Sequence, residues 1–165
     1  MTVHTIQNIQ NIPISLEQAW SFYSSPANLQ MITPPQMKLR IISKNREGRL
    51  YPGLVIEYKV SPLMGIPLYW MTEIRQVSEP ASFVDEQRKG PYRYWQHRHY
   101  FKTIEGGVEM KDIIEYKNPL GLLGEMANSL FIKRKLRQLF EYRFHKIEEL
   151  FGKWPGGQEM NLKIK

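Results

Sequence analysis

The stretch Trp95-Gln96-His97-Arg98-His99-Tyr100-Phe101 predicts a β-strand near the middle of the chain. Side chains alternate across a strand, so one face of this strand carries Trp95, His97, His99 and Phe101. If that face points inward, two imidazoles lie among aromatic rings inside the protein. Buried polar groups need partners, so the stretch indicates either an internal hydrogen-bond network or a pocket.

The same period of two extends on both sides of this stretch, from Met37 to Lys117. We expect six strands there: Lys38–Asn45, Gly53–Ser61, Leu68–Val77, Phe83–Arg88, Tyr94–Thr103 and Val108–Lys117. Residues typical of turns separate them: Glu47-Gly48, Pro62 to Gly65, Glu79-Pro80, Gly90-Pro91 and Gly106-Gly107. Short connections between consecutive strands predict an antiparallel meander.

One strand and two short helices are expected before the meander. The segment from Thr2 to Gln10 is rich in β-forming residues. Ser15-Leu16-Glu17-Gln18 is a capping-box pattern that begins a helix. Ser25-Pro26 places proline at the first position of a second helix. Thr33-Pro34-Pro35 ends that helix, because proline disfavours helical geometry in the residue before it.

A long helix is expected between Asn118-Pro119-Leu120-Gly121 and Gly152, a residue suited to a helix C-terminus. One stripe of this helix recurs at spacings of three and four: Ser129, Ile132, Leu136, Phe140, Arg143, Ile147 and Leu150. The segment from Gly152 to Gly157 is poor in apolar residues. We therefore expect one domain over residues 1–151 and a flexible C-terminal tail over residues 152–165.

This order of elements predicts an α+β fold with a curved, seven-stranded antiparallel sheet. The sheet must cover its apolar face, and the long amphipathic helix is the only element large enough to do so. A strongly curved sheet wrapped around that helix leaves space between them. Concave, mainly apolar spaces with a few polar groups are where small ligands bind.

The composition excludes several classes of protein. With 42% hydrophobic and 24% charged residues the chain resembles an ordinary soluble protein, and no apolar run reaches the roughly 20 residues of a membrane span. The start of the chain lacks the pattern of a signal peptide. The absence of cysteine excludes disulfides and thiolate chemistry, and we expect a cytoplasmic protein.

The net charge of +7 invites an interpretation as a nucleic-acid-binding or membrane-binding protein. The densest basic run, Lys133-Arg134-Lys135-Leu136-Arg137, falls on the predicted long helix beside its apolar stripe. No zinc-finger spacing, nucleotide-binding loop or aromatic RNA-binding signature accompanies it. We therefore expect a solvated helix face and no nucleic-acid partner.

Several stretches resemble the START/SRPBCC superfamily, and in particular a bacterial branch of SRPBCC ligand-binding proteins. They are Ile32-Thr33-Pro34-Pro35, the run from Phe83 to Tyr92, the run from Trp95 to Phe101, Asp112, Tyr116, Pro119-Leu120-Gly121 and Phe140-Glu141-Tyr142-Arg143. The superfamily includes lipid-transfer domains and polyketide cyclases. The resemblance covers roughly residues 1 to 151 and implies a helix-grip fold with a cavity for a hydrophobic ligand. It implies no single reaction, because this fold serves binders, carriers and enzymes.

Strand alternation also predicts which polar residues point inward. The apolar residues Val108, Met110, Ile114 and Tyr116 carry Asp112 inward with them, and Phe83 carries Asp85 and Gln87. The other inward sets are Ile56, Tyr58 and Val60 on one strand and Leu68, Trp70, Thr72 and Ile74 on the next. The interior then holds six polar residues: Asp85, Gln87, His97, His99, Asp112 and Arg143. This is more than an ordinary core contains.

Three interpretations of this polar set are open. It can be a closed network in which Arg143 pairs with Asp85 or Asp112 and each histidine donates to a carboxylate. It can be the polar end of a pocket that orients a carboxyl, hydroxyl or ketone group. It can also be a metal site, with both histidines and one carboxylate as ligands. The spacing alone is a weak metal signal, and we expect neither a metal ion nor a cofactor.

Catalysis is the main alternative to binding. A histidine beside a carboxylate can act as a general acid or base near neutral pH, as a cyclase or aromatase requires. The sequence contains no nucleophile motif, so we assign no catalytic residue.

We therefore expect a cavity that binds a small hydrophobic or amphipathic molecule: a lipid, a polyketide or another aromatic metabolite. The expected binding residues are Tyr58, Trp70, Asp85, Gln87, Trp95, His97, His99, Phe101, Met110, Asp112 and Arg143. A second alternative is a lipid carrier at a membrane surface. It rests on an apolar start to the long helix, formed by Leu120, Leu122, Leu123, Met126, Leu130 and Phe131. Such faces usually pack into the core instead.

Overall fold

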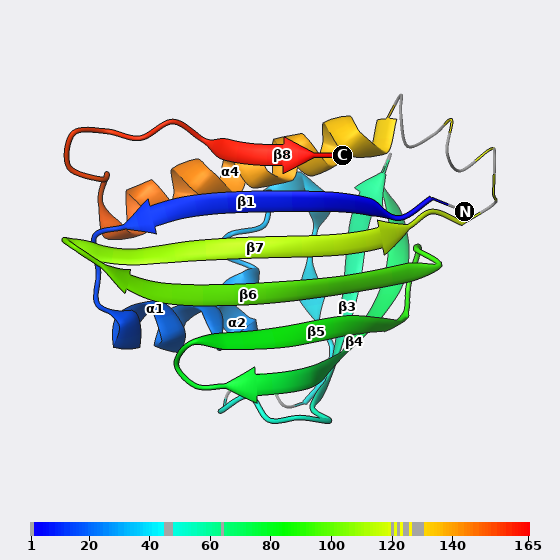
Figure 1. The fold of residues 1–165 in the computed structure, drawn as a ribbon. Helices are drawn as coiled ribbons and strands as arrows, with labels where there is room; N and C mark the ends of the chain where they lie inside the picture. Colours follow the sequence, from blue (N-terminus) through cyan, green and yellow to red (C-terminus); the bar gives the residue numbers. More distant parts are fainter. Residues whose placement is uncertain are drawn as a thin grey trace.

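A computed structural model describes residues 2–44, 48–63, 65–119, 121, 123, 126 and 131–165, with the side chains of residues 62 and 63 excepted. Over these residues it contains one antiparallel sheet of eight strands in the order β2-β3-β4-β5-β6-β7-β1-β8 (Figure 1). The strands are β1 (His4–Ile12), β2 (Arg40–Ile41), β3 (Val55–Leu63), β4 (Ile66–Ser78), β5 (Ser82–Lys89), β6 (Tyr94–Ile104), β7 (Gly107–Lys117) and β8 (Asn161–Ile164). The predicted α+β class and antiparallel meander are confirmed.

The sheet is strongly curved, and the described helices lie on one side of it. Figure 1 shows β6, β7 and β1 side by side, while β3 and β4 turn steeply away from them behind the sheet. The long helix α4 (Lys133–Phe151) packs against β1 and β8, and α1 (Leu16–Tyr23) packs against β6 and β7. A hydrogen bond from Gln10 Nε2 to the Phe144 carbonyl oxygen, 3.0 Å long, ties β1 to α4.

The residues predicted to begin or end a helix do so at the starts of the first two helices and at the end of α4. Ser15 and Gln18 form both hydrogen bonds of the capping box at the start of α1. The one-turn helix α2 (Pro26–Leu29) begins with the predicted proline. Gly152, with φ of +94°, follows the last residue of α4, in a backbone conformation that favours glycine. A short 3-10 helix, η1 (Pro35–Met37), precedes β2.

Two expectations about the strands are wrong. The flexible tail predicted for residues 152–165 contains β8, which pairs antiparallel with β1, with Ile164 opposite Ile6. The described sheet therefore has eight strands and not seven. The other error concerns Lys38–Asn45, where the described residues form only the two-residue strand β2; Asn45 lies outside them.

Half of the residues predicted to form the apolar start of the long helix fall outside the described residues. These are Leu120, Leu122 and Leu130, and Ser129 of the predicted helix stripe also lies outside the described residues. Its described members do not lie in the core: Leu123, Met126 and Phe131 are exposed. Among the described helices, none is long and apolar enough to cross a membrane.

Candidate functional site

The predicted inward faces are confirmed for the central strands. Ile56, Tyr58 and Val60 of β3 are buried. Every second residue of β7 is buried, namely Val108, Met110, Asp112, Ile114 and Tyr116. On β6 the inward residues are also buried or nearly so, so both histidines of the opening stretch lie inside the protein.

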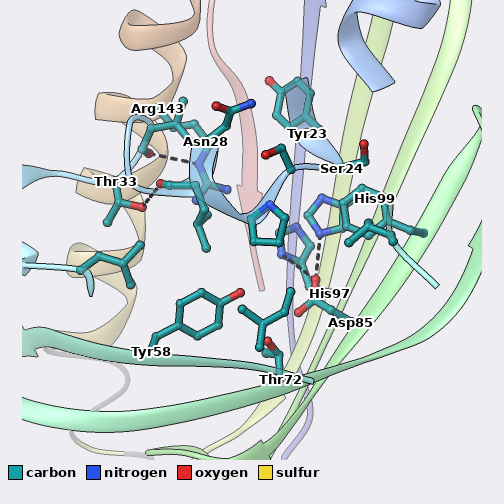
Figure 2. Close-up of a pocket in the computed structure, with 18 of the residues that line it drawn as sticks. Tyr23, Ser24, Asn28, Thr33, Tyr58, Thr72, Asp85, His97, His99 and Arg143 are labelled. Carbon is teal, nitrogen blue, oxygen red and sulfur yellow. Dashed lines mark hydrogen bonds and ion pairs between the residues drawn. The ribbon is translucent and has the colours of Figure 1, made fainter. Parts of the chain in front are cut away.

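A cavity of about 190 Å³ lies between the sheet and the helices α1, α2 and α4. Figure 2 shows Arg143 of α4 on one side of it and His97, His99 and Asp85 on the other. Tyr58 and Thr72 close the cavity from β3 and β4, while Tyr23, Ser24 and Asn28 approach from α1 and α2. Most other residues that line it are apolar, such as Ile32, Leu39, Val60 and Trp70.

The sheet side of the cavity carries a cluster of two histidines and two carboxylates. His97 Nε2 lies 2.8 Å from Asp112 Oδ1, and His99 Nε2 lies 2.9 Å from Asp85 Oδ2. The two imidazole rings are 3.7 Å apart between centroids, and the Phe83 ring stacks on His99 at 4.0 Å. We call Asp85, His97, His99 and Asp112 the polar cluster.

The hydrogen bonds of the polar cluster run diagonally across the strands. In the sheet register His97 stands opposite Asp85 on β5, and His99 stands opposite Asp112 on β7. Each histidine nevertheless bonds to the carboxylate on its other neighbouring strand. Asp112 lies two residues from Ile114, which stands opposite His97, and Asp85 lies two residues from Phe83, which stands opposite His99, a diagonal that long side chains can reach. The arrangement places the two closely spaced, mutually tilted imidazole rings between the two carboxylates.

Asp112 forms the closed side of the cluster. Its side chain is 0% exposed, and its second oxygen accepts a 3.4 Å hydrogen bond from Asn8 Nδ2 on β1. Burial alone opposes ionisation of this carboxyl, but the hydrogen bond from His97 and the close contact with His99 outweigh it and lower the pKa of Asp112 far below its usual range. Asp112 is therefore ionised near neutral pH and anchors the imidazoles.

The two histidines differ in protonation. Burial and the neighbouring His99 lower the pKa of His97, despite its bond to Asp112. Burial acts against the charged form of His99 as well, but its contacts with Asp112 and Asp85 prevail and raise its pKa above the ordinary value. Near neutral pH the cluster thus pairs a neutral His97 with a His99 that retains its proton more strongly.

The helix side of the cavity differs from the prediction. Arg143 is 9% exposed, and its Nε donates one long hydrogen bond of 3.5 Å to the Ile32 carbonyl oxygen. Its guanidinium also lies 5.3 Å from the centre of the Phe140 ring. No carboxylate of the described residues pairs with it, so the expected ion pair with Asp85 or Asp112 is wrong.

Eight of the eleven predicted binding residues line the cavity: Tyr58, Trp70, Asp85, Trp95, His97, His99, Met110 and Arg143. The other three lie outside its lining. Gln87 is occupied by hydrogen bonds to the backbone of Tyr92, and Phe101 packs against Trp20 and Tyr23. Asp112 lies behind the histidines.

Sequence reasoning missed the contribution of the short helices and of β1. Tyr23, Asn28 and Thr33 line the cavity, and Asn8 holds Asp112. A signal for Asn8 was present, because the alternation of Ile6 and Ile12 along β1 places it on the buried face. No comparable signal exists for Tyr23, since the position of a one- or two-turn helix over a sheet depends on distant contacts.

Burial raises the pKa of both cavity tyrosines, Tyr23 and Tyr58, well above the ordinary value. Both hydroxyls therefore remain protonated at physiological pH and can donate hydrogen bonds into the cavity.

Comparison with known proteins adds support for the fold alone. No family model matches the chain, and no curated protein matches it. Among solved structures, a START superfamily protein from Mycobacterium smegmatis superposes with a TM-score of 0.63 at 16% identity, over 89% of this chain and 99% of that one. Protein Ms6760 from the same organism gives 0.64 at 17% identity, over 88% and 89% of the two chains. Ara h 8.0201 gives 0.60 at 17% identity, over 91% and 98%. The chain thus has the helix-grip fold of START/SRPBCC proteins, as its sequence predicted.

Proposed function

We propose that this protein binds a small, mainly apolar molecule carrying an acidic group, in the cavity between α4 and the sheet. The observation that carries the proposal is Arg143, a buried cation without a carboxylate partner among the described residues. A buried charge is costly unless an opposite charge and hydrogen bonds compensate it. An acidic group on a ligand would supply both.

The size of the cavity favours a compact ligand over a long-chain lipid. Pockets for drug-sized molecules span about 300–1,000 Å³, whereas a cavity of about 150 Å³ holds a single benzene ring. At about 190 Å³, the cavity suits an aromatic acid of one ring with a short side chain. A larger polyketide or a lipid requires α4 or the short helices to move outward.

Polar groups on two opposite walls of the cavity could bind two different parts of such a ligand. Arg143 would hold the acidic group through a charge-assisted bidentate pair. The Tyr23 and Tyr58 hydroxyls can donate to a second oxygen, and Asp85 with His99 can bind a hydroxyl or ketone at the opposite wall. The cysteine-free sequence is compatible with this role in the reducing cytoplasm.

A titration of the full chain with trans-cinnamate and with its neutral amide tests the proposal. We expect the acid to bind roughly 10- to 100-fold more tightly than the amide, because hydrogen bonds to a charged group contribute about 1.5–3 kcal/mol. Arg143→Met should remove this preference. Arg137→Met, on the same helix but exposed, is the matched control and should keep it. Equal binding of acid and amide, or no binding of either, would contradict the proposal.

A second candidate function is acid–base catalysis of the cyclase or aromatase type in the same cavity. It is favoured by the hydrogen bond that orients His97 on Asp112, since a base held by a third group recurs in catalytic sites. The lowered pKa of His97 keeps its imidazole available as a base. Exchange of α-protons for deuterium on an aryl ketone acid, followed by NMR, would reveal this activity. It should be lost in His97→Gln, and an exchange rate equal to that of buffer would exclude it for that substrate class.

A further inference from the structure

Three side chains of the polar cluster converge on one point at the cavity wall. Asp85, His97 and His99 each offer one donor atom, and these atoms lie within 4.8 Å of one another. Asp85 Oδ2 is 2.9 Å from His99 Nε2 and 4.0 Å from His97 Nδ1. Two ligands of a tetrahedral metal with bonds of about 2.0–2.1 Å lie roughly 3.4 Å apart. The observed separations lie on either side of that value.

The second ring nitrogen of each imidazole, on the side away from this point, lies near the same carboxylate, that of Asp112. Asp112 Oδ1 lies 2.8 Å from His97 Nε2 and 3.3 Å from His99 Nδ1. Metal-binding histidines almost always donate their second ring N–H to a carboxylate or carbonyl, which orients the ring and leaves the other nitrogen free for the metal. Asp112 is placed to do this for both rings, and Asn8 holds it in position.

One atom of the cluster is unsatisfied as it stands. His99 Nδ1 is buried and makes no hydrogen bond of acceptable geometry, although Asp112 is near. A small rotation of this ring would direct Nδ1–H to Asp112 and the lone pair of Nε2 toward the point shared with Asp85. Buried polar groups rarely lack a partner, and such a rotation would give this atom one.

We propose that Asp85, His97 and His99 form a binding site for one divalent transition-metal ion, with Asp112 as the carboxylate that orients both histidines. Two imidazoles and one carboxylate on one side of an ion leave its other positions open, as in catalytic zinc and non-haem iron sites. Here the open side faces the cavity. The charge of the ion is balanced by Asp85 and Asp112.

The ligand types select among metals. Imidazole suits Zn²⁺, Fe²⁺, Co²⁺ and Cu²⁺, whereas Ca²⁺ and Mg²⁺ prefer all-oxygen sites. The sequence pattern alone led to the opposite expectation, because His-x-His on a strand is common without a metal. The structure adds the geometry: of the two carboxylates that the sequence offered as a third ligand, Asp85 on β5 lies together with both histidines, and Asp112 on β7 lies behind both rings.

Cobalt titration of the full chain after chelator treatment tests the site without any organic ligand. We expect one Co²⁺ per chain, with visible absorption bands typical of four or five ligands, displaced by one equivalent of Zn²⁺. Asp85→Asn and His99→Gln should each remove these bands. Asp112→Asn should weaken binding by about 10- to 100-fold, the usual effect of a group that orients a ligand. His145→Ala is the control for surface binding, because its side chain is 76% exposed, and should change nothing.

Nitrogen-15 NMR of the wild-type imidazoles gives a second readout that requires no variant to fold. Addition of Zn²⁺ should shift His97 Nδ1 and His99 Nε2 and leave the ring nitrogens of His4 and His145 unchanged. The site is excluded if wild-type protein binds no Co²⁺ or Zn²⁺ stoichiometrically, or if zinc shifts other histidines only. It is equally excluded if Asp85→Asn folds and retains the cobalt bands. The acid-ligand proposal stands or falls separately, since cinnamate is absent from these experiments.

Discussion

The two walls of the cavity hold their buried charges in different ways. On the sheet, each charged or polar side chain of the polar cluster contacts another member of the cluster at hydrogen-bond distance. On the helix, Arg143 has one long bond to a backbone carbonyl and no carboxylate partner in the described structure. Buried charges that already contact one another need no ligand to compensate them, whereas a buried cation without a counter-charge gains one when an acidic ligand binds. The comparison therefore separates a wall whose charges the protein itself compensates from a wall whose cation is left for a ligand.

The largest effect is expected at the closed side of the sheet wall, from Asp112→Asn. This change removes the charged acceptor of both histidines from a fully buried position. Breaking a buried charge pair typically costs about 3–5 kcal/mol, and we expect a loss of this size in the free energy of unfolding measured in urea. Glu115→Gln on the same strand is the control. It breaks a partly exposed pair with Arg98, and its cost should stay below about 1 kcal/mol.

A smaller loss is expected from Asp85→Asn at the open side of the same cluster. Asp85 bonds to His99 but borders the cavity, where water can replace part of the lost interaction. We expect a destabilisation of about 1–3 kcal/mol by the same measurement. Glu86→Gln, the outward neighbour, should change stability by less than about 1 kcal/mol. A loss equal to that of Asp112→Asn would show that the cluster has no open side.

On the helix wall, Arg143→Met should leave stability nearly unchanged or raise it. The substitution replaces a buried cation that lacks a counter-charge with an apolar side chain of similar length. We expect the free energy of unfolding to rise or to fall by no more than about 1 kcal/mol. A loss comparable to that of Asp112→Asn would mean that the protein itself stabilises the guanidinium, and the contrast between the two walls would disappear.

The smallest effect is the opposite pKa shift of the two histidines, which NMR titration can measure for each ring. His97 should remain neutral below pH 6.5, and His99 should remain charged above it. The groups that face them are Asp85 on β5, Asp112 on β7, Tyr23 on α1, Tyr58 on β3 and Arg143 on α4. Equal pKa values for both rings would contradict the asymmetric pairing.

The signs of these shifts determine how stability depends on pH. His99, with its raised pKa, contributes stability that is fully present below pH 6.5 and is lost as pH rises through its folded pKa. His97, with its lowered pKa, reduces stability as pH falls below 6.5, because the unfolded chain then binds the proton more readily. Asp112 stabilises the fold above the unfolded carboxyl pKa of about 4, and this contribution declines in more acidic solution. Urea denaturation across this pH range measures the sum.

Much of the fold followed from local pattern. The period of two along the meander predicted five of its six strands to within two residues at either end, and Ser15 with Gln18 marked the start of α1 correctly. The inward direction of Asp85, His97, His99 and Asp112 also followed, because a residue within a strand shares a face with its apolar neighbours. Strand β8 was missed since its four residues, Asn161–Ile164, are too few for a clear pattern and become a strand only by pairing with β1.

The sequence by itself determined which side chains point into the protein, because alternation in strands and spacing in helices are properties of the local backbone. Only the tertiary structure decided what those side chains meet there. The diagonal bonds of the polar cluster depend on the register and twist of β5, β6 and β7, and the place of Arg143 depends on where α4 crosses the loop after α2. The prediction that Asp85, Asp112 and Arg143 all point inward was therefore not enough to predict an ion pair between them. The separation of a paired sheet wall from an unpaired helix wall arises from contacts between residues far apart in the chain.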